Sequence, residues 1–325
     1  MFRTILKRYR ATDAVGAAVG DGMRSGSGLW RGKELPTAAV AFIAVLLAAP
    51  SAHAVDEIQI YTADINEVGQ FSIEQHLNYT IKGLTDPAYP GALIDNHALN
   101  GTPEFAYGVT PWLELGLYIP FAVNEQGQFL SNNFKLRTEF AIPDAGKKDF
   151  FYGINFEYDF PSWSFVPGHF AMEVRPIIGW RNPQWEFIIN PIIDFSWGGQ
   201  LGGVDFAPAA RLARNLGEDR FVGIEYYTGL GTPGNWQSFQ QQSHQLFAVT
   251  DFKIGEVDVD LGIGYGLTPG SDRWVAKMIL GYAFPVPGKK SDDSSSGMKT
   301  PMNLRSMFPE QSPEQMARNP LAFMQ

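Results

Sequence analysis

Apolar and polar residues alternate along much of this chain with a period of two, most clearly in residues 257–267, VDVDLGIGYGL. Every second residue of this stretch is apolar, and the residues between them are Asp or Gly. Successive side chains of a β-strand point to opposite faces, so the stretch predicts a strand with one apolar face and one small, acidic face. A helix has a period of 3.6 and would mix the two sets.

The same alternation predicts twelve strands, most of them near the 9–11 residues that a tilted membrane-spanning strand needs. Pro176, Pro191 and Pro208 lie inside three of them and predict bulges or local edges, because proline donates no ladder hydrogen bond. The predicted strands are Phe71–Gly83, Thr102–Val109, Leu113–Phe121, Asn133–Ile142, Asp149–Phe160, Gly168–Arg181, Trp185–Trp197, Asp205–Asn215, Arg220–Gly231, His244–Ile254, Val257–Leu267 and Arg273–Phe284.

Short and long connections alternate between these strands. The short ones are residues 110–112, 143–148, 182–184, 216–219 and 255–256, and the long ones are 84–101, 122–132, 161–167, 198–204 and 232–243, with 268–272 as a shorter member of the second set. Bacterial outer-membrane barrels have short periplasmic turns, longer outer loops and an even number of strands. The sequence therefore predicts an all-β, transmembrane, antiparallel up-and-down β-barrel over residues 71–284.

Alternation alone does not tell whether the apolar face points outward to lipid or inward, because a soluble lipocalin-like barrel has the same period with its apolar face inward. Aromatic residues gather at the predicted strand ends, with Trp185 and Trp197 at opposite ends of one strand. The other face carries Gly, Asn and charges of both signs, which suits a polar lumen. The last strand ends in Met278-x-Leu280-x-Tyr282-x-Phe284, which resembles the terminal aromatic signature of outer-membrane proteins. These features favour an apolar face toward outer-membrane lipid, and the barrel-assembly machinery as a partner.

The segments outside the predicted barrel have different compositions. Residues 38–49 are apolar, follow Arg31 and Lys33, and precede the small-x-small sequence Ala52-His53-Ala54. This pattern predicts a signal peptide over residues 1–54, cleaved after Ala54, and hence export to the outer membrane of a Gram-negative bacterium; Met23 is an alternative start. Residues 55–70 are a periplasmic lead-in, a plug or an extra strand. Residues 285–325 are polar and of low complexity, and predict a disordered tail.

Charge and cysteine content exclude several classes of function. The chain has no Cys, which removes disulfides and thiolate metal sites, and it has no apolar run of 18 residues that would form a transmembrane helix. From residue 55 onward it carries 18 basic and 31 acidic residues, a net charge of −13. Such an acidic chain lacks the basic patches that nucleic-acid binding requires.

Residues 103–121, PEFAYGVTPWLELGLYIPF, carry a family resemblance. The stretch resembles the hairpin common in outer-membrane proteins of the phenol meta-cleavage degradation group (the MetA-pathway group). In that group a YG-apolar-T turn joins two barrel strands, and an LGL-Y-x-P-aromatic strand follows. The resemblance implies an outer-membrane barrel linked to the passage of small, often aromatic or hydrophobic compounds. It brings no catalytic residues.

The candidate site is the set of charged residues on the predicted inner face, since such rings set selectivity in a pore. An alternative is a salt-bridged interior that only fills the lumen, because twelve strands lie between the filled eight-stranded barrel and the open sixteen-stranded one. The Lys135/Arg137 and Asp258/Asp260 pairs would create a transverse field if they faced each other. The set is Lys135, Arg137, Glu139, Glu157, Glu173, Arg175, Glu186, Asp194, Arg211, Glu225, Asp251, Lys253, Asp258, Asp260 and Lys277.

We expect a passive channel for a small-molecule solute, with a closed structural barrel as an alternative. A lipid-modifying enzyme is a further alternative and would need a histidine base, but His76, His97, His169 and His244 lie in no serine-hydrolase motif. No phosphate loop, HExxH or EF-hand pattern is present, so the sequence predicts no cofactor and no metal. Loop 84–101 either folds over the barrel mouth or is exposed. Gly262, Gly264 and Gly266 lack side chains, so we expect open space or an inserted loop beside them in the outer half of the lumen.

Overall fold

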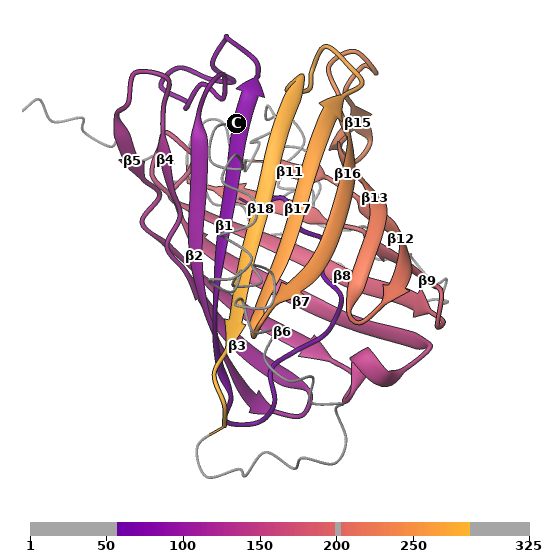
Figure 1. Ribbon diagram of the computed structural model, residues 1–325. Helices are drawn as coiled ribbons and strands as arrows, with labels where there is room; N and C mark the ends of the chain where they lie inside the picture. Colours follow the sequence, from indigo (N-terminus) through magenta and orange to yellow (C-terminus); the bar gives the residue numbers. More distant parts are fainter. Residues whose placement is uncertain (1–56, 199–202, 287–325) are drawn as a thin grey trace, which may run out of the picture.

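The chain folds into a closed antiparallel β-barrel, seen here in a computed structural model that describes residues 57–198 and 203–286 (Figure 1). The wall strands of this part pair in chain order, and the first and last pair with each other to close the ring. They are β1 (Phe71–Lys82), β2 (Leu99–Thr110), β3 (Leu113–Tyr118), β6 (Phe134–Ala141), β7 (Phe150–Phe160), β8 (Phe170–Arg181), β9 (Trp185–Asn190), β12 (Ala209–Gly217), β13 (Arg220–Gly229), β16 (Ser243–Ile254), β17 (Val257–Gly266) and β18 (Trp274–Ala283).

The twelve wall strands confirm the number and order of the strands predicted from the alternation. Most differ only at their ends, but the predicted strands Trp185–Trp197 and Asp205–Asn215 are each divided in two. The remaining short strands lie in or next to the long connections: β4 (Phe121–Val123), β5 (Phe129–Ser131), β10 (Ile193–Trp197), β11 (Gly203–Phe206), β14 (Gly231–Thr232) and β15 (Asn235–Trp236). The 3-10 helix η1 (Ala145–Lys147) lies in a short turn. Among the described residues, no helix has the length and apolarity to cross a membrane. The predicted signal peptide and nearly all of the predicted tail lie outside those residues.

Three prolines interrupt the wall at one level. The register of β8 with β9 and β10 is continuous, and it places Pro191 opposite Pro176. The registers of β9 with β12 and of β10 with β11 likewise place Pro208 opposite Pro191. None of the three residues donates a ladder hydrogen bond, so the two strand paths separate here into β9 and β10 and into β11 and β12.

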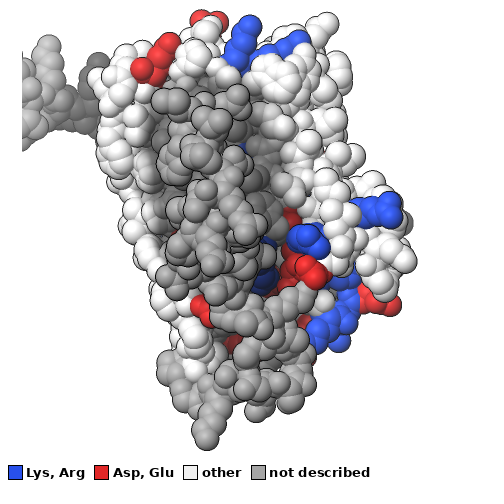
Figure 2. All heavy atoms as spheres, viewed as in Figure 1, with Lys and Arg blue, Asp and Glu red and all other residues white. Residues whose placement is uncertain are grey.

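The apolar face of the strands points outward, as β6 shows. Phe134, Leu136 and Phe140 are exposed on the outside, while Lys135, Arg137 and Glu139 are less than 10% exposed inside. A soluble barrel would bury the apolar set instead. On the face seen in Figure 2, the described side chains of the wall are mostly uncharged, and charged atoms gather near the upper rim and in the lower half. Exposed tryptophans lie at the strand ends, among them Trp112, Trp180 and Trp185 at one end and Trp163, Trp197 and Trp274 at the other.

The two ends of the barrel differ in their connections. We call them the short-turn end, where β1 begins, and the long-loop end, where β1 finishes at the top of Figure 1. At the long-loop end, the connection after β1 meets the connection between β7 and β8. The Leu93 amide donates to the Ser164 carbonyl oxygen (2.7 Å), and the Tyr89 hydroxyl donates to the Trp163 carbonyl oxygen (3.0 Å). Of the two alternatives for loop 84–101, the structure therefore shows a loop folded over the mouth.

Candidate functional site

Residues 57–66 run through the interior of the barrel, and we call them the lumen segment. The chain turns into the barrel at the short-turn end, where the Gly69 amide donates to the Gly108 carbonyl (2.8 Å) and the Gly108 amide to the Gln70 carbonyl (3.0 Å). Further along, the Asn66 amide donates to the Glu114 carboxylate (2.6 Å). The indigo path before β1 in Figure 1 follows this course inside the wall strands.

Tyr61 is the best-connected residue of the lumen segment. Its amide donates to the side-chain oxygen of Asn190 (2.8 Å), and the Asn190 amide group donates back to the Tyr61 carbonyl (3.2 Å). Its hydroxyl hydrogen-bonds that of Tyr118 (2.6 Å) and donates to Glu157 (3.0 Å). The Arg175 guanidinium lies over its ring, 4.2 Å from the centroid. Buried polar groups are expensive to leave unpaired, so this network fixes the segment in one position.

An apolar patch on the inner wall supports the same segment. Ile60 and Ala63, both nearly inaccessible, pack in one cluster with Phe151, Ile177 and Ile188, which point inward from β7, β8 and β9. The inner face of these strands therefore carries apolar residues where Ile60 and Ala63 pack against it. Burial of these side chains stabilises the segment inside the barrel but is non-directional. The hydrogen bonds of Tyr61 fix the segment's position along the wall.

The lumen segment separates two cavities. The long-loop cavity, about 230 Å³, is lined by Glu57, Ile58 and Gln59, by loop 84–95 and by the half of the wall nearer the long-loop end. The short-turn cavity, about 290 Å³, is lined by residues 59–67 and by the half of the wall nearer the short-turn end. Both linings are acidic, with one arginine each. Their carboxylates are Glu57, Asp86, Asp95, Glu173, Asp194, Asp205 and Asp272 in the first, and Asp64, Glu67, Glu74, Glu104, Glu114, Glu139 and Asp258 in the second.

The first group of lumen charges surrounds Arg137. Its guanidinium contacts Glu139 on the same strand (3.0 Å), Glu114 on the neighbouring strand β3, and Glu104 on the next strand, β2 (2.9 Å). Glu104 also contacts His76, which in turn faces Glu74. We call this group the acidic wall; it comprises Glu74, His76, Glu104, Glu114, Arg137 and Glu139. A single arginine thus faces four carboxylates.

The second group lies on β8, β9, β12, β13 and β16 to β18, and is close to neutral. Arg211 contacts Glu186 (3.3 Å), Glu225 (2.7 Å) and Asp251, and Arg181 also contacts Glu186 (3.3 Å). Lys277 contacts Glu225 (2.6 Å) and Asp260 (3.2 Å). We call it the balanced wall; it comprises Arg181, Glu186, Arg211, Glu225, Asp251, Asp260 and Lys277. Three cations face four carboxylates here.

Other predicted residues join the lumen segment to the wall. Arg175 pairs with Glu173 (2.5 Å) and donates to the Gln59 carbonyl (3.1 Å). Lys135 lies 3.6 Å from Glu157 and 3.8 Å from Glu57 of the segment. Asp194 lines the long-loop cavity beside Glu173, since the two residues are opposite each other in the β8–β10 register. These contacts place predicted wall charges directly against the lumen segment.

Lys253 and Asp258 differ from the rest of the predicted set. They form an ion pair (3.0 Å) next to a short turn, and their side chains are 45% and 57% exposed. They therefore mark the rim, although Asp258 also lines the short-turn cavity. A transverse field between the Lys135/Arg137 and Asp258/Asp260 pairs is replaced by local ion pairs. Lys135 pairs with Glu157, and Asp260 pairs with Lys277.

The glycines of β17 do not leave the open space that we expected. A side chain at Gly264 would collide with the Phe247 ring, and one at Gly262 would collide with the Lys277 side chain. At Gly266 the backbone of Asp272 approaches closely. The prediction was wrong because larger neighbours use the volume that the glycines vacate, and Phe247 is fully buried there.

Several site residues were not in the predicted set. Glu74 and His76 follow the alternation on the polar face of β1, and Glu104 and Glu114 are inward-facing charges on β2 and β3, so the same rule would have found them. Tyr61 carries no such signal, because the lumen segment has no alternation that places it. Of the histidines, His244 hydrogen-bonds Tyr226 through Nδ1 (2.6 Å) and Gln242 through Nε2 (2.9 Å), so neither nitrogen faces a serine.

Comparison with solved structures finds outer-membrane barrels. An outer membrane channel from Pseudomonas putida F1 aligns with a TM-score of 0.52 and 9% sequence identity, over 70% of this chain and 100% of that one. The NanC porin has a TM-score of 0.43 and 9% identity over 66% and 98% of the two chains, and LpxR from Salmonella typhimurium has 0.36 and 9% over 65% and 99%. No protein-family model and no curated protein matches the sequence. The first likeness shows a shared outer-membrane barrel fold.

Proposed function

We propose that this protein is an outer-membrane channel for small molecules, closed at rest by its own lumen segment. The observation that carries the proposal is the position of residues 57–66. They lie between two cavities, of about 230 and 290 Å³, inside a barrel with an apolar outer face. A polar lumen within an apolar exterior is the arrangement of a membrane barrel. The long-loop end then faces outward and the short-turn end faces the periplasm.

Opening requires the lumen segment to move, and its contacts allow this. Among the described residues, the segment is joined to the wall by hydrogen bonds, ion pairs and two apolar clusters, one around Ile60 and Ala63 and one in which Ile58 packs against Phe247. Residues 67–70 connect it to β1. The hydrogen bonds that hold Tyr61 come from Asn190, Tyr118 and Glu157, so these residues set the threshold for displacement. Without displacement, the barrel is the closed structural barrel of the alternative reading.

The charge of the two cavities defines the solute. Each cavity is lined by seven carboxylates and one arginine, so an anion entering from either end meets a repulsive field. Neutral and cationic molecules are favoured. The aromatic and hydrophobic compounds implied by the hairpin of residues 103–121 are compatible with this field when they are uncharged or cationic. We therefore propose small neutral or cationic solutes, aromatic ones included.

The test is conductance across a planar lipid bilayer. The chain from Val55 and a variant lacking residues 55–66 are refolded in detergent, and heat-modifiable gel migration confirms that both barrels are closed. We expect rare, brief openings from the complete chain, and steady, cation-selective conductance from the deletion variant. If the folded deletion variant does not conduct, the barrel is a closed structure and the channel proposal fails.

The membrane assignment has its own test. The protein should sediment with outer-membrane fragments and require detergent for release. Recovery in the soluble periplasmic fraction would contradict the outward apolar face as a lipid contact. We expect the unfractionated and detergent-released protein to show the same heat-modifiable migration, because the barrel is already closed in the membrane.

A further inference from the structure

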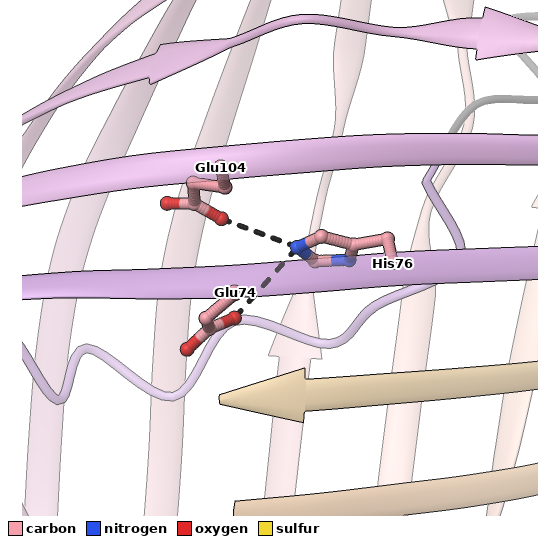
Figure 3. Close-up of side chains that lie close together, drawn as sticks. All are labelled: Glu74, His76 and Glu104. Atoms are coloured by element: carbon pink, nitrogen blue, oxygen red, sulfur yellow. Dashed lines mark hydrogen bonds and ion pairs between the residues drawn. The ribbon is translucent and has the colours of Figure 1, made fainter. Parts of the chain in front are cut away.

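Glu74, His76 and Glu104 converge on one point of the lumen wall (Figure 3). Glu74 and His76 are two residues apart on β1, so their side chains share the inner face. The β1–β2 register places Glu104 directly opposite Glu74. The strand pairing therefore brings two carboxylates and one imidazole together, with Nε2 of His76 between the two acids.

The distances suit a shared metal ion. His76 Nε2 lies 3.2 Å from Glu104 Oε2 and 3.7 Å from Glu74 Oε2, and the three ligand atoms all lie within 4.8 Å of one another. A tetrahedral Zn²⁺ with ligands at 2.0–2.2 Å separates its ligand atoms by about 3.3–3.6 Å. Imidazole and carboxylate are ligands that zinc and its neighbours in the first transition series accept.

The charges around this point demand a cation. Like charges directly opposite each other in an antiparallel pair are destabilising, and Glu74 and Glu104 are such a pair. Arg137 contacts Glu104 but shares its single charge with Glu114 and Glu139, so it does not balance the pair. The acidic wall therefore retains a negative excess next to the only imidazole in the group.

Burial and access are also appropriate. The side chains of His76 and Glu104 are 1% and 4% exposed, so their positions are fixed by packing, while Glu74 is 36% exposed. Glu74 and Glu104 line the short-turn cavity, which provides an entry path and an open coordination position for water. His76 Nδ1 has no hydrogen-bond partner among the described residues, so Nε2 is the nitrogen with a defined role.

We propose that Glu74, His76 and Glu104 form a binding site for a divalent transition-metal ion of the Zn²⁺ type, open to the short-turn cavity. This site does not depend on the channel proposal, because it is built by β1 and β2 alone. It also touches the lumen segment, since Gln59 Nε2 donates to Glu74 Oε2 (3.5 Å). A bound ion would take this oxygen from Gln59 and loosen one contact of the segment.

The test is zinc binding to the refolded chain from Val55, without an affinity tag, measured by isothermal titration calorimetry in detergent. We expect one Zn²⁺ per barrel. Glu74→Gln and His76→Gln should each weaken binding about tenfold or more. The matched controls are Asp251→Asn on the balanced wall and His244→Gln at the long-loop end, which should bind as the unmodified chain does.

Two outcomes would overturn the site. Absence of zinc binding at millimolar concentration in the correctly folded chain would mean that His76 is held by the two glutamates as an ion pair, without a metal. Equal affinity in the chain with and without Glu74→Gln would place the zinc elsewhere. Glu74 is the most exposed of the three ligands, so its variant keeps the test valid if His76→Gln fails to fold.

Discussion

The two charged walls of the lumen are built from the same residue types but are balanced differently. On the balanced wall, Arg181, Arg211 and Lys277 face four carboxylates, and the contacts run continuously from Glu186 to Asp260. On the acidic wall, Arg137 contacts three of the four carboxylates, and the fourth, Glu74, contacts His76. The central side chains of both walls, Arg137 and Glu104 on one and Lys277 and Glu225 on the other, are less than 10% exposed, so solvent screens their charges only weakly.

The difference separates filling from binding. A balanced, buried ion-pair network costs desolvation and returns little net stability, but it occupies the lumen and is strongly destabilised when one partner is lost. An unbalanced cluster is not satisfied by the protein's own groups, which indicates a ligand. The balanced wall thus corresponds to the salt-bridged interior anticipated from the sequence, and the acidic wall to a site that takes up a cation.

The largest expected effect is the loss of one cation from the balanced wall. Lys277→Met leaves Glu225 and Asp260 without their ammonium partner, and the side chains of Lys277 and Glu225 are at most 1% exposed. We expect the free energy of unfolding to fall by about 3–5 kcal/mol, as for other broken buried pairs. Urea unfolding in detergent micelles, followed by tryptophan fluorescence, measures it.

Lys147→Ala is the matched control for this prediction. Lys147 pairs with Asp144 (2.9 Å) in an exposed short turn, so its removal should leave the unfolding midpoint unchanged. A similarly small effect of Lys277→Met would show that the balanced wall is not balanced by its ion pairs, and the contrast with the acidic wall would fail.

The second prediction uses zinc to distinguish the walls. At one hundred times its dissociation constant, zinc should stabilise the unmodified chain by about 2.7 kcal/mol. The increment should be larger in Arg137→Met, since the substitution removes a positive charge close to the proposed ion, and unchanged in Lys277→Met. Urea unfolding of the three chains with and without zinc measures the increments. Equal increments in all three chains would show that the charge of Arg137 does not affect zinc binding at the proposed site.

The architecture of the barrel was predictable from the sequence because the alternation of apolar and polar residues is a local property of each strand. The alternation within each strand of residues 71–284 shows which side chains share a face, and it predicts the twelve strands. The outward direction of the apolar face follows from the aromatic residues at the strand ends and the charges of both signs on the other face. The inward position of Lys135, Arg137 and Glu139 on β6 is an example. The signal needs no knowledge of the neighbouring strands.

The partners of these residues were not predictable in the same way. Which carboxylate contacts Arg137 depends on the register between strands, and the contact of Tyr61 with Asn190 joins residues 129 positions apart. The lumen segment has no alternation of apolar and polar residues from which its contacts could be predicted. The error at Gly264 has the same origin, because the ring that fills its space belongs to Phe247 on the neighbouring strand.

A third prediction concerns Tyr61, whose hydroxyl contacts Tyr118 and Glu157 rather than either charged wall. Tyr61→Phe leaves these two groups without that hydroxyl and should lower the free energy of unfolding by about 1–3 kcal/mol. It should also raise the frequency of channel openings in a planar bilayer, because the lumen segment is held less firmly. Tyr61→Phe with Tyr118→Phe removes both hydroxyls and should be less than additive. Additive effects would mean that the two hydroxyls do not cooperate in closing the lumen.

The smallest expected effect is at the mouth, where two further carboxyl groups, those of Asp95 and Asp272, interact. Burial, and then the neighbouring Asp272, raise the pKa of Asp95 from 3.8 to about 8. The folded loop therefore holds a proton that the unfolded chain loses near pH 4, so its contribution to stability is complete below that pH and is lost as the pH rises through about 8. Here the excess of negative charge is relieved by a proton, whereas at the acidic wall we propose a metal ion.

Hydrogen exchange of the Leu93 amide measures this effect, because that amide bonds Ser164 across the mouth (2.7 Å). After correction for the intrinsic rate, its protection should decrease severalfold between pH 6 and 9 as the loop loosens. Asp95→Asn should remove this dependence, since the amide does not ionise. The Asn182 amide, bonded to the Trp185 carbonyl in a short turn (2.8 Å), is the internal control and should show constant protection. A decrease that persists in Asp95→Asn would assign the loosening to another group and leave the mouth carboxyls without a role.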